Sequence, residues 1–127
     1  MECVAMIVAG FGFRASATAA SLLDAFERAV EADRPTHLSA PDDKADAACM
    51  RAVAENLQLP VVPVDGGAAL AMHTITQSPR VLAERGTGSV AEAVALAAAG
   101  EGARLAGPRA ISEDRLATCA IAMGAAF

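Results

Sequence analysis

Residues 86–93 form a glycine-rich block whose residue types suit the binding of an anion. Gly86, Thr87 and Gly88 lead to Ser89, and Glu92 follows three residues after that serine. The spacing of Ser89 and Glu92 is that of a capping box, which marks the first turn of a helix. A helix start presents free backbone N–H groups and a partial positive charge, so it attracts anionic groups. The block therefore predicts an anion-binding helix start; a capped helix with a purely structural role is the alternative.

A second glycine-rich segment, Gly10-Phe11-Gly12-Phe13-Arg14, follows the first hydrophobic run of the chain. We expect it to form a turn, because glycine accepts backbone conformations that are closed to other residues. The guanidinium of Arg14 can grip a carboxylate through two parallel hydrogen bonds. Two alternatives stay open: the glycines only allow close packing, or with Ala15 they form the G-x-G-x-x-G/A fingerprint of a dinucleotide site. That fingerprint lacks its ribose-binding acid, because the next predicted strand ends without an acidic residue before Asp42.

Lys44 is the one lysine in the chain, and it stands just after two aspartates near the end of a predicted strand. Functional side chains of α/β proteins face the crevice at such strand ends. The neighbouring carboxylates favour the charged amine, so we interpret Lys44 as a charge contact rather than as a proton-transfer or imine-forming group. The alternative is a surface lysine paired with an aspartate.

Short apolar runs alternate with helical patterns along the chain. The expected strands are 3–9, 36–40, 60–64, 103–106 and 116–123; the last run also fits a helix by pattern, but its Thr and Ile residues favour a strand. The expected helices follow Ser16, Asp42 or Asp43, and Asp65, and two more run over 78–85 and 89–99. This alternation predicts a single α/β domain over residues 1–127, a three-layer α/β/α sandwich with a mixed, mostly parallel central sheet of about five strands.

The composition argues against several classes of function. A net charge of −5 and an aromatic content of 3%, without Trp or Tyr, argue against nucleic-acid binding. No apolar run reaches the roughly 18 residues of a membrane span, and the N-terminus lacks the basic region of a signal peptide. Three cysteines without C-x-x-C spacing and two isolated histidines suit no metal motif. We therefore expect a cytoplasmic protein that has no metal, no cofactor and no membrane contact.

The segments described above, taken in order, resemble the CobE proteins and the C-terminal domain of CbiG, a family of cobalamin (vitamin B12) biosynthesis. The resemblance covers nearly the whole chain and rests on residues 10–14, 39–46, 86–93 and 116–122. Two positions depart from the family's pattern. Phe13 stands where the family often has cysteine, and Ala47 stands where an acidic residue commonly follows the lysine.

The resemblance implies a three-layer fold and a part in building the corrin ring. The implied ligand is a precorrin or a tetrapyrrole like hydrogenobyrinic acid, whose fringe of acetates and propionates calls for concentrated hydrogen-bond donors and cations. The expected ligand-binding residues are Gly10, Phe11, Gly12, Arg14, Lys44, Gly86, Thr87, Gly88, Ser89 and Glu92.

The sequence leaves several hypotheses about the function open. The chain is expected to bind or carry the intermediate, and assistance in lactone opening or another ring modification is left open, so no catalytic residue is assigned. A Rossmann-like nucleotide-binding module and a non-catalytic interaction subunit of another biosynthetic enzyme are the alternatives. The sequence also leaves open which intermediate binds, whether the chain forms a homodimer, and whether it contacts other cobalamin-biosynthesis enzymes.

Overall fold

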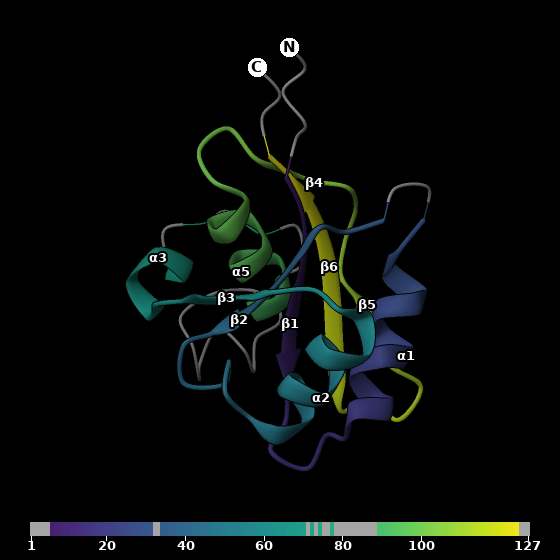
Figure 1. Cartoon of the computed structure of the whole chain (residues 1–127). Helices are drawn as coiled ribbons and strands as arrows, with labels where there is room; N and C mark the ends of the chain where they lie inside the picture. Colours follow the sequence, from purple (N-terminus) through teal and green to yellow (C-terminus); the bar gives the residue numbers. More distant parts are fainter. Residues whose placement is uncertain are drawn as a thin grey trace.

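The computed structural model describes residues 6–31, 34–70, 72, 74, 77 and 89–124. The strands are β1 (Ile7–Phe13), β2 (His37–Pro41), β3 (Val61–Val64), β4 (Arg104–Leu105), β5 (Ala110–Ile111) and β6 (Ala117–Met123). The helices are α1 (Ala19–Ala29), α2 (Ala48–Leu57), α3 (Gly66–Leu70) and α5 (Val90–Ala99) (Figure 1). The helix expected over 78–85 lies outside the described residues. The other expected helices and strands are present with shifted ends, so the α/β class is confirmed.

The strands form one mixed sheet in the order β3-β2-β1-β6-β4, with β5 also paired to β6. The β1–β2 and β2–β3 pairs are parallel, whereas β6 is antiparallel to β1, β4 and β5. The sheet is mixed, as expected, and has six strands where about five were expected. The expectation that it is mostly parallel is wrong, because the closing strand β6 returns through the middle of the sheet and makes three antiparallel pairs. The three-layer stacking stays a prediction.

The segment with Gly10 and Gly12 is part of a strand, and the predicted turn is wrong. β1 runs on to Phe13 and pairs with β6 over seven residues. A Cβ on Gly10 would lie 2.7 Å from the backbone nitrogen of Ala95 in α5, and still closer to the carbonyl oxygen of Ala91. The glycines thus let α5 lie directly on β1, which is the close-packing alternative. The dinucleotide fingerprint loses its basis, because it needs a glycine turn between strand and helix.

The helix caps also differ in part from the sequence expectations. α1 is capped by Thr18 rather than Ser16, and Thr18 and Ser21 form its capping box. α2 begins at Ala48 with no side-chain cap, so neither Asp42 nor Asp43 caps it. Asp65 does cap α3, because its Oδ1 accepts from the N–H of Ala68 at 2.8 Å. The difference at α1 arises because several short polar residues precede the helix and each can serve as its cap. At α2, Asp42 and Asp43 lie in the turn that follows β2, several residues before the helix begins.

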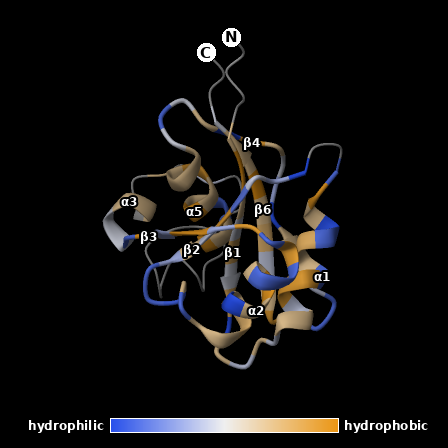
Figure 2. Ribbon diagram, in the orientation of Figure 1, coloured by the Kyte–Doolittle hydropathy of each residue, from blue (hydrophilic) through white to orange (hydrophobic). Residues whose placement is uncertain are grey.

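Neighbouring residues of β1 contact different helices. Phe11 is fully buried and belongs to a core with Phe26 and Leu22 of α1, and the two phenylalanine rings stack with centroids 6.4 Å apart. Gly10 faces α5 instead. Figure 2 shows hydrophobic residues along β6 and α5, and hydrophilic ones mainly in the connecting loops. Within the described residues, no helix combines the length and the apolar character needed to cross a bilayer.

Candidate functional site: a cation-lined cleft

A cleft of about 480 Å³ lies where four elements end close together. The carboxyl ends of the parallel strands β1 and β2 meet there with the start of β6, which is antiparallel to β1 and therefore begins at that edge. Val90, the first residue of α5, also lines the cleft. Segments that lie far apart in the sequence thus meet at the carboxyl end of β1. In Figure 1 this is the end at which the β1 arrow points. This is the edge at which α/β sheets bind ligands.

The cleft is lined by cationic side chains. Arg14, Lys44, Arg109 and Arg115 are among its lining residues, and none of the described lining residues is acidic. The chain as a whole carries a net charge of −5, so this concentration of positive charge is local. A cleft lined by one sign of charge focuses the field and attracts ligands of the opposite sign. The arrangement therefore suits an anionic ligand.

Lys44 is positioned by the turn that follows β2. The carbonyl oxygen of Pro41 accepts from the Lys44 backbone N–H at 2.8 Å. The Lys44 Nζ donates to the carbonyl oxygen of Phe13 at 2.7 Å and lies 4.9 Å from the centroid of the Phe13 ring. In the part of the chain that the structure describes, no carboxylate forms an ion pair with Lys44. The paired-surface-lysine alternative is thus not observed, and the ammonium keeps N–H donors for a ligand.

Arg14 lies directly after β1, and its backbone is fixed at both ends. Its N–H donates to the carbonyl oxygen of Leu116 at 2.9 Å, and its own carbonyl oxygen accepts from the N–H of Ala17 at 3.0 Å. The side chain is exposed and lines the cleft, and it forms no ion pair with any described residue. A rigid backbone with a free guanidinium suits the bidentate carboxylate contact expected of this residue.

Ser89 caps α5 as predicted, whereas the Glu92 half of the expected capping box stays a prediction, and both residues lie beneath the surface. Ser89 caps the helix by accepting from the Glu92 N–H at 3.3 Å, and both residues are fully buried. The Glu92 carboxylate accepts from the backbone N–H of Arg109 at 2.8 Å. Glu92 thus holds the segment that brings Arg109 to the cleft, and neither Ser89 nor Glu92 lines the cleft itself. The predicted site residues Gly86, Thr87 and Gly88 lie outside the described residues.

The structure thus brings together part of the predicted site. Gly12, Arg14 and Lys44 line one cleft, whereas Gly10 and Phe11 are buried beneath it. Sequence reasoning missed Arg109 and Arg115, together with the hydroxyl-bearing Ser16 and Thr118. No local sequence motif marks these residues. From the sequence alone, Arg109 and Arg115 look like ordinary surface arginines that precede β5 and β6. Only the antiparallel placement of β6 brings Arg115 to the cleft.

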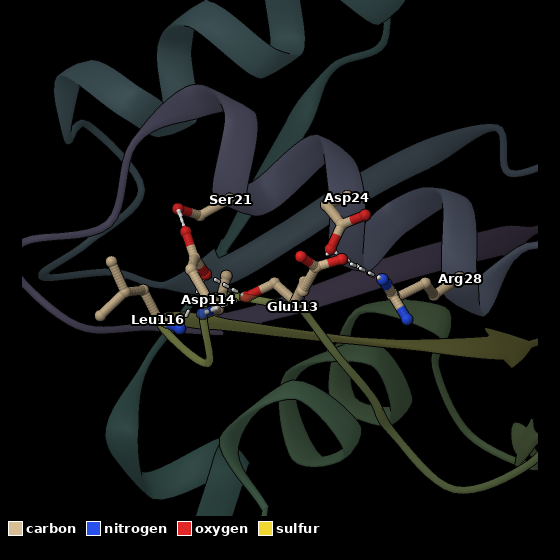
Figure 3. Close-up of polar contacts among 8 residues, drawn as sticks. Ser21, Asp24, Arg28, Glu113, Asp114 and Leu116 are labelled. Atoms are coloured by element: carbon tan, nitrogen blue, oxygen red, sulfur yellow. Dashed lines mark hydrogen bonds and ion pairs between the residues drawn. The ribbon is translucent and has the colours of Figure 1, made fainter.

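The loop that carries Arg115 is held to α1 by two aspartates (Figure 3). The Asp114 carboxylate accepts from the hydroxyls of Ser112 at 2.6 Å and Ser21 at 2.5 Å. These two hydrogen bonds, with that from Ser112 the stronger influence, hold the Asp114 pKa below its usual range. Asp24 of α1 accepts from the Glu113 N–H at 2.7 Å, and this bond is the main cause of its lowered pKa. Both carboxylates therefore favour the ordered loop when they are ionised.

Cys119 of β6 is a poor candidate for a nucleophile, and the described residues hold no cluster of metal-binding side chains. No group of three or more His, Cys, Asp or Glu side chains among them is arranged to hold a metal ion. Cys119 is fully buried, and burial raises the pKa of its thiol far above the ordinary value. A thiol that stays protonated is a poor nucleophile.

The fold and the cleft define an α/β protein with a mixed six-stranded sheet and a cation-lined cleft at the end of β1. Residues 7–122 match the family model described as "Cobalamin synthesis G C-terminus", so the chain belongs to this family of cobalamin biosynthesis proteins. The resemblance to the CobE and CbiG C-terminal family is thereby confirmed.

Two solved structures agree with this membership. The chain is 27% identical to CobE, "a protein from the cobalamin (vitamin B12) biosynthetic pathway", with a TM-score of 0.81 over 100% of this chain and 96% of that one. It is 34% identical to the cobalamin biosynthesis protein chiG from Agrobacterium tumefaciens str. C58, with a TM-score of 0.73 over 94% of this chain and 99% of that one. No curated protein sequence matches the chain.

Proposed function

We propose that the chain binds an anionic tetrapyrrole intermediate of cobalamin biosynthesis, of the precorrin or hydrogenobyrinic acid type, in the cleft at the end of β1. The observation that carries this proposal is the gathering of four cationic side chains, in an acidic protein, around a cleft whose described lining residues include no Asp or Glu. Its membership of a cobalamin biosynthesis family supports the choice of ligand.

The chemistry of the cleft suits the edge of such a macrocycle. The cleft has a volume of about 480 Å³, which is typical of a small-molecule site. It can therefore hold one edge of the macrocycle, with the acetate and propionate side chains of that edge. Arg14 and Lys44 present guanidinium and ammonium donors for carboxylates. Phe13 is half-buried at the cleft, where its ring offers an apolar contact for the macrocycle.

The residues of the cleft favour a binding or carrier role over catalysis. None of its described lining residues is a cysteine, histidine, aspartate or glutamate. General acid–base and nucleophilic catalysis mostly use those side chains, so the cleft holds strong binding groups but few catalytic ones. Incubation with a late precorrin in excess over the protein tests this: stoichiometric binding without conversion supports the carrier role, and multiple turnovers refute it.

The binding itself is tested by titration with hydrogenobyrinic acid, followed by visible absorbance. We expect a saturable spectral change for the wild type and at least about tenfold weaker binding for Lys44→Met, because a hydrogen-bonded charge contact is lost. Arg51→Gln is the matched control: it removes the same charge from an exposed position on α2 that does not line the cleft. No spectral change with the folded wild type at high micromolar ligand would refute the proposal.

A further inference from the structure

Arg115 has an unusual backbone conformation at the rim of the cleft. Its φ is 62°, in the left-handed region that residues with a side chain seldom occupy. Among the described residues, Gln58 is the other non-glycine residue with a positive φ. Gln58 ends α2 as a left-handed cap, which is a common way to end a helix, whereas Arg115 sits in the loop before β6. Arg115 instead ends the tight turn that joins β5 to β6, where a left-handed residue is common and glycine is the usual choice, so an arginine at this position costs some stability.

The hydrogen bonds around Arg115 impose this conformation. Asp114 Oδ1 accepts from the Leu116 N–H at 3.0 Å and from the Ser112 hydroxyl at 2.6 Å, so it ties together both sides of the arginine. The Arg115 N–H itself donates to the Ser112 carbonyl oxygen at 2.9 Å. Asp114 Oδ2 accepts from Ser21 and fixes the turn to α1. We call these contacts of Asp114 the clamp.

The same contacts leave the guanidinium of Arg115 without an acidic partner among the described residues. The carboxylate of Asp114 is occupied by the clamp, and that of Glu113 lies 3.5 Å from Arg28 on α1. No ion pair joins Arg115 to any described residue, and its side chain is exposed and lines the cleft. A strained residue with an unpaired charge at a ligand cleft is typical of a binding group held ready for its ligand.

We propose that Arg115 binds a carboxylate of the ligand, and that the Asp114 clamp holds it in its strained backbone conformation to do so, at some loss of folding stability. This inference rests on the proposed function, because it assumes an anionic ligand in the cleft. Arg115 is the ligand-binding residue here, and Asp114 is a positioning residue that acts through it.

The proposal predicts opposite effects of one substitution on stability and on binding. Arg115→Gly relieves the backbone strain, so we expect Tm to rise by a few degrees, and it removes the guanidinium, so we expect affinity for hydrogenobyrinic acid to fall at least about tenfold. Arg115→Asn tests the charge separately, since asparagine tolerates the left-handed region, and it should bind as weakly as Arg115→Gly. The control Arg51→Asn removes an exposed arginine outside the cleft and should bind as the wild type does.

A double-mutant cycle separates the positioning role of Asp114 from a general structural one. Asp114→Asn should weaken binding in the wild-type background and have no further effect on binding in the Arg115→Gly background. Equal weakening in both backgrounds would overturn the positioning role. Binding by Arg115→Gly at wild-type affinity would overturn the ligand contact, and a lowered Tm would overturn the strain.

The result for the wild type distinguishes this inference from the proposed function. If the folded wild type does not bind hydrogenobyrinic acid, the proposed function fails, and the ligand contact of Arg115 fails with it. If the wild type binds and the Arg115 variants bind equally well, only the inference fails.

Discussion

Substitution of Gly10 by alanine tests whether the close approach of α5 to β1 sets the geometry of the cleft. Gly10 is buried in the middle of β1, and an added Cβ would meet the backbone of α5 at Ala91 and Ala95. The distance to the Ala95 nitrogen would be 2.7 Å, which is well inside van der Waals contact. Because these are backbone atoms, no side-chain rotation relieves the clash. The helix must move away from the strand by about 1 Å.

The expected loss of stability follows from two opposing terms. Overpacking of a close-packed interior costs about 1–3 kcal/mol. Replacing glycine with alanine restricts the unfolded chain and returns about 0.4–1 kcal/mol. Because the added Cβ meets backbone atoms, the upper half of the first range applies, and we expect Gly10→Ala to lower the free energy of unfolding by about 1–2.5 kcal/mol. The displacement of α5 also moves Val90 at the cleft, so binding of hydrogenobyrinic acid should weaken in the same variant.

Urea unfolding of the wild type, Gly10→Ala and Gly66→Ala measures this effect. Gly66 is a suitable control, because a Cβ added there meets nothing within 4 Å, and its position at the start of α3 favours alanine. Gly66→Ala should be as stable as the wild type or slightly more stable. The reasoning is refuted if Gly10→Ala unfolds at the same urea concentration as the wild type with an unchanged slope.

Three further predictions concern buried and anchoring groups. The pKa values of Asp24 and Asp114 are lowered in the folded protein, so the free energy of unfolding should fall once the pH drops below about 3.8. In the Asp114→Asn variant this free energy should fall less steeply with decreasing pH, as measured by urea unfolding at a series of pH values. Glu92→Ala should lower the free energy of unfolding by about 1–3 kcal/mol in the same assay, because the backbone N–H of Arg109 loses its acceptor on the buried Glu92 side chain. A thiol reagent should label half-buried Cys49 in the folded protein and Cys119 only after unfolding, as read by peptide mass mapping; equal labelling rates would contradict the burial of Cys119.

The sequence predicted the elements of this fold better than their arrangement. The apolar runs at β2 and β3 and the cap at Ser89 depend on local residue patterns, so they were correctly placed. The direction of β6 relative to β1 depends on long-range pairing, which no local pattern encodes. Gly10 and Gly12 were expected in a turn because glycine permits one, yet here they serve the contact between a strand and a helix.

The site was predictable to the extent that it depends on strand ends. Arg14 and Lys44 follow β1 and β2, and parallel neighbours bring their ends to one edge, so both line the cleft. Arg115 could not be placed without knowing that β6 runs antiparallel to β1 and starts at that edge. The burial of Glu92 was equally hidden, because a capping-box glutamate is usually exposed, and its contact with Arg109 joins residues 17 positions apart.

The hydrogen bond from Gly124 to Met6, at 2.7 Å between nitrogen and oxygen, joins the described ends of the central antiparallel pair. β1 enters the sheet at this edge and runs toward the opposite one (Figure 1). Arg14 and Lys44 follow β1 and β2 there and line the cleft. A covalent link between these neighbouring points would close residues 6–124 into a ring without touching the cleft, and a new break in an exposed loop away from the cleft would then give a circularly permuted chain. A fusion partner attached at either point would likewise leave the mouth of the cleft open, so the protein can be tethered to a surface or to an enzyme without hindering access of its ligand.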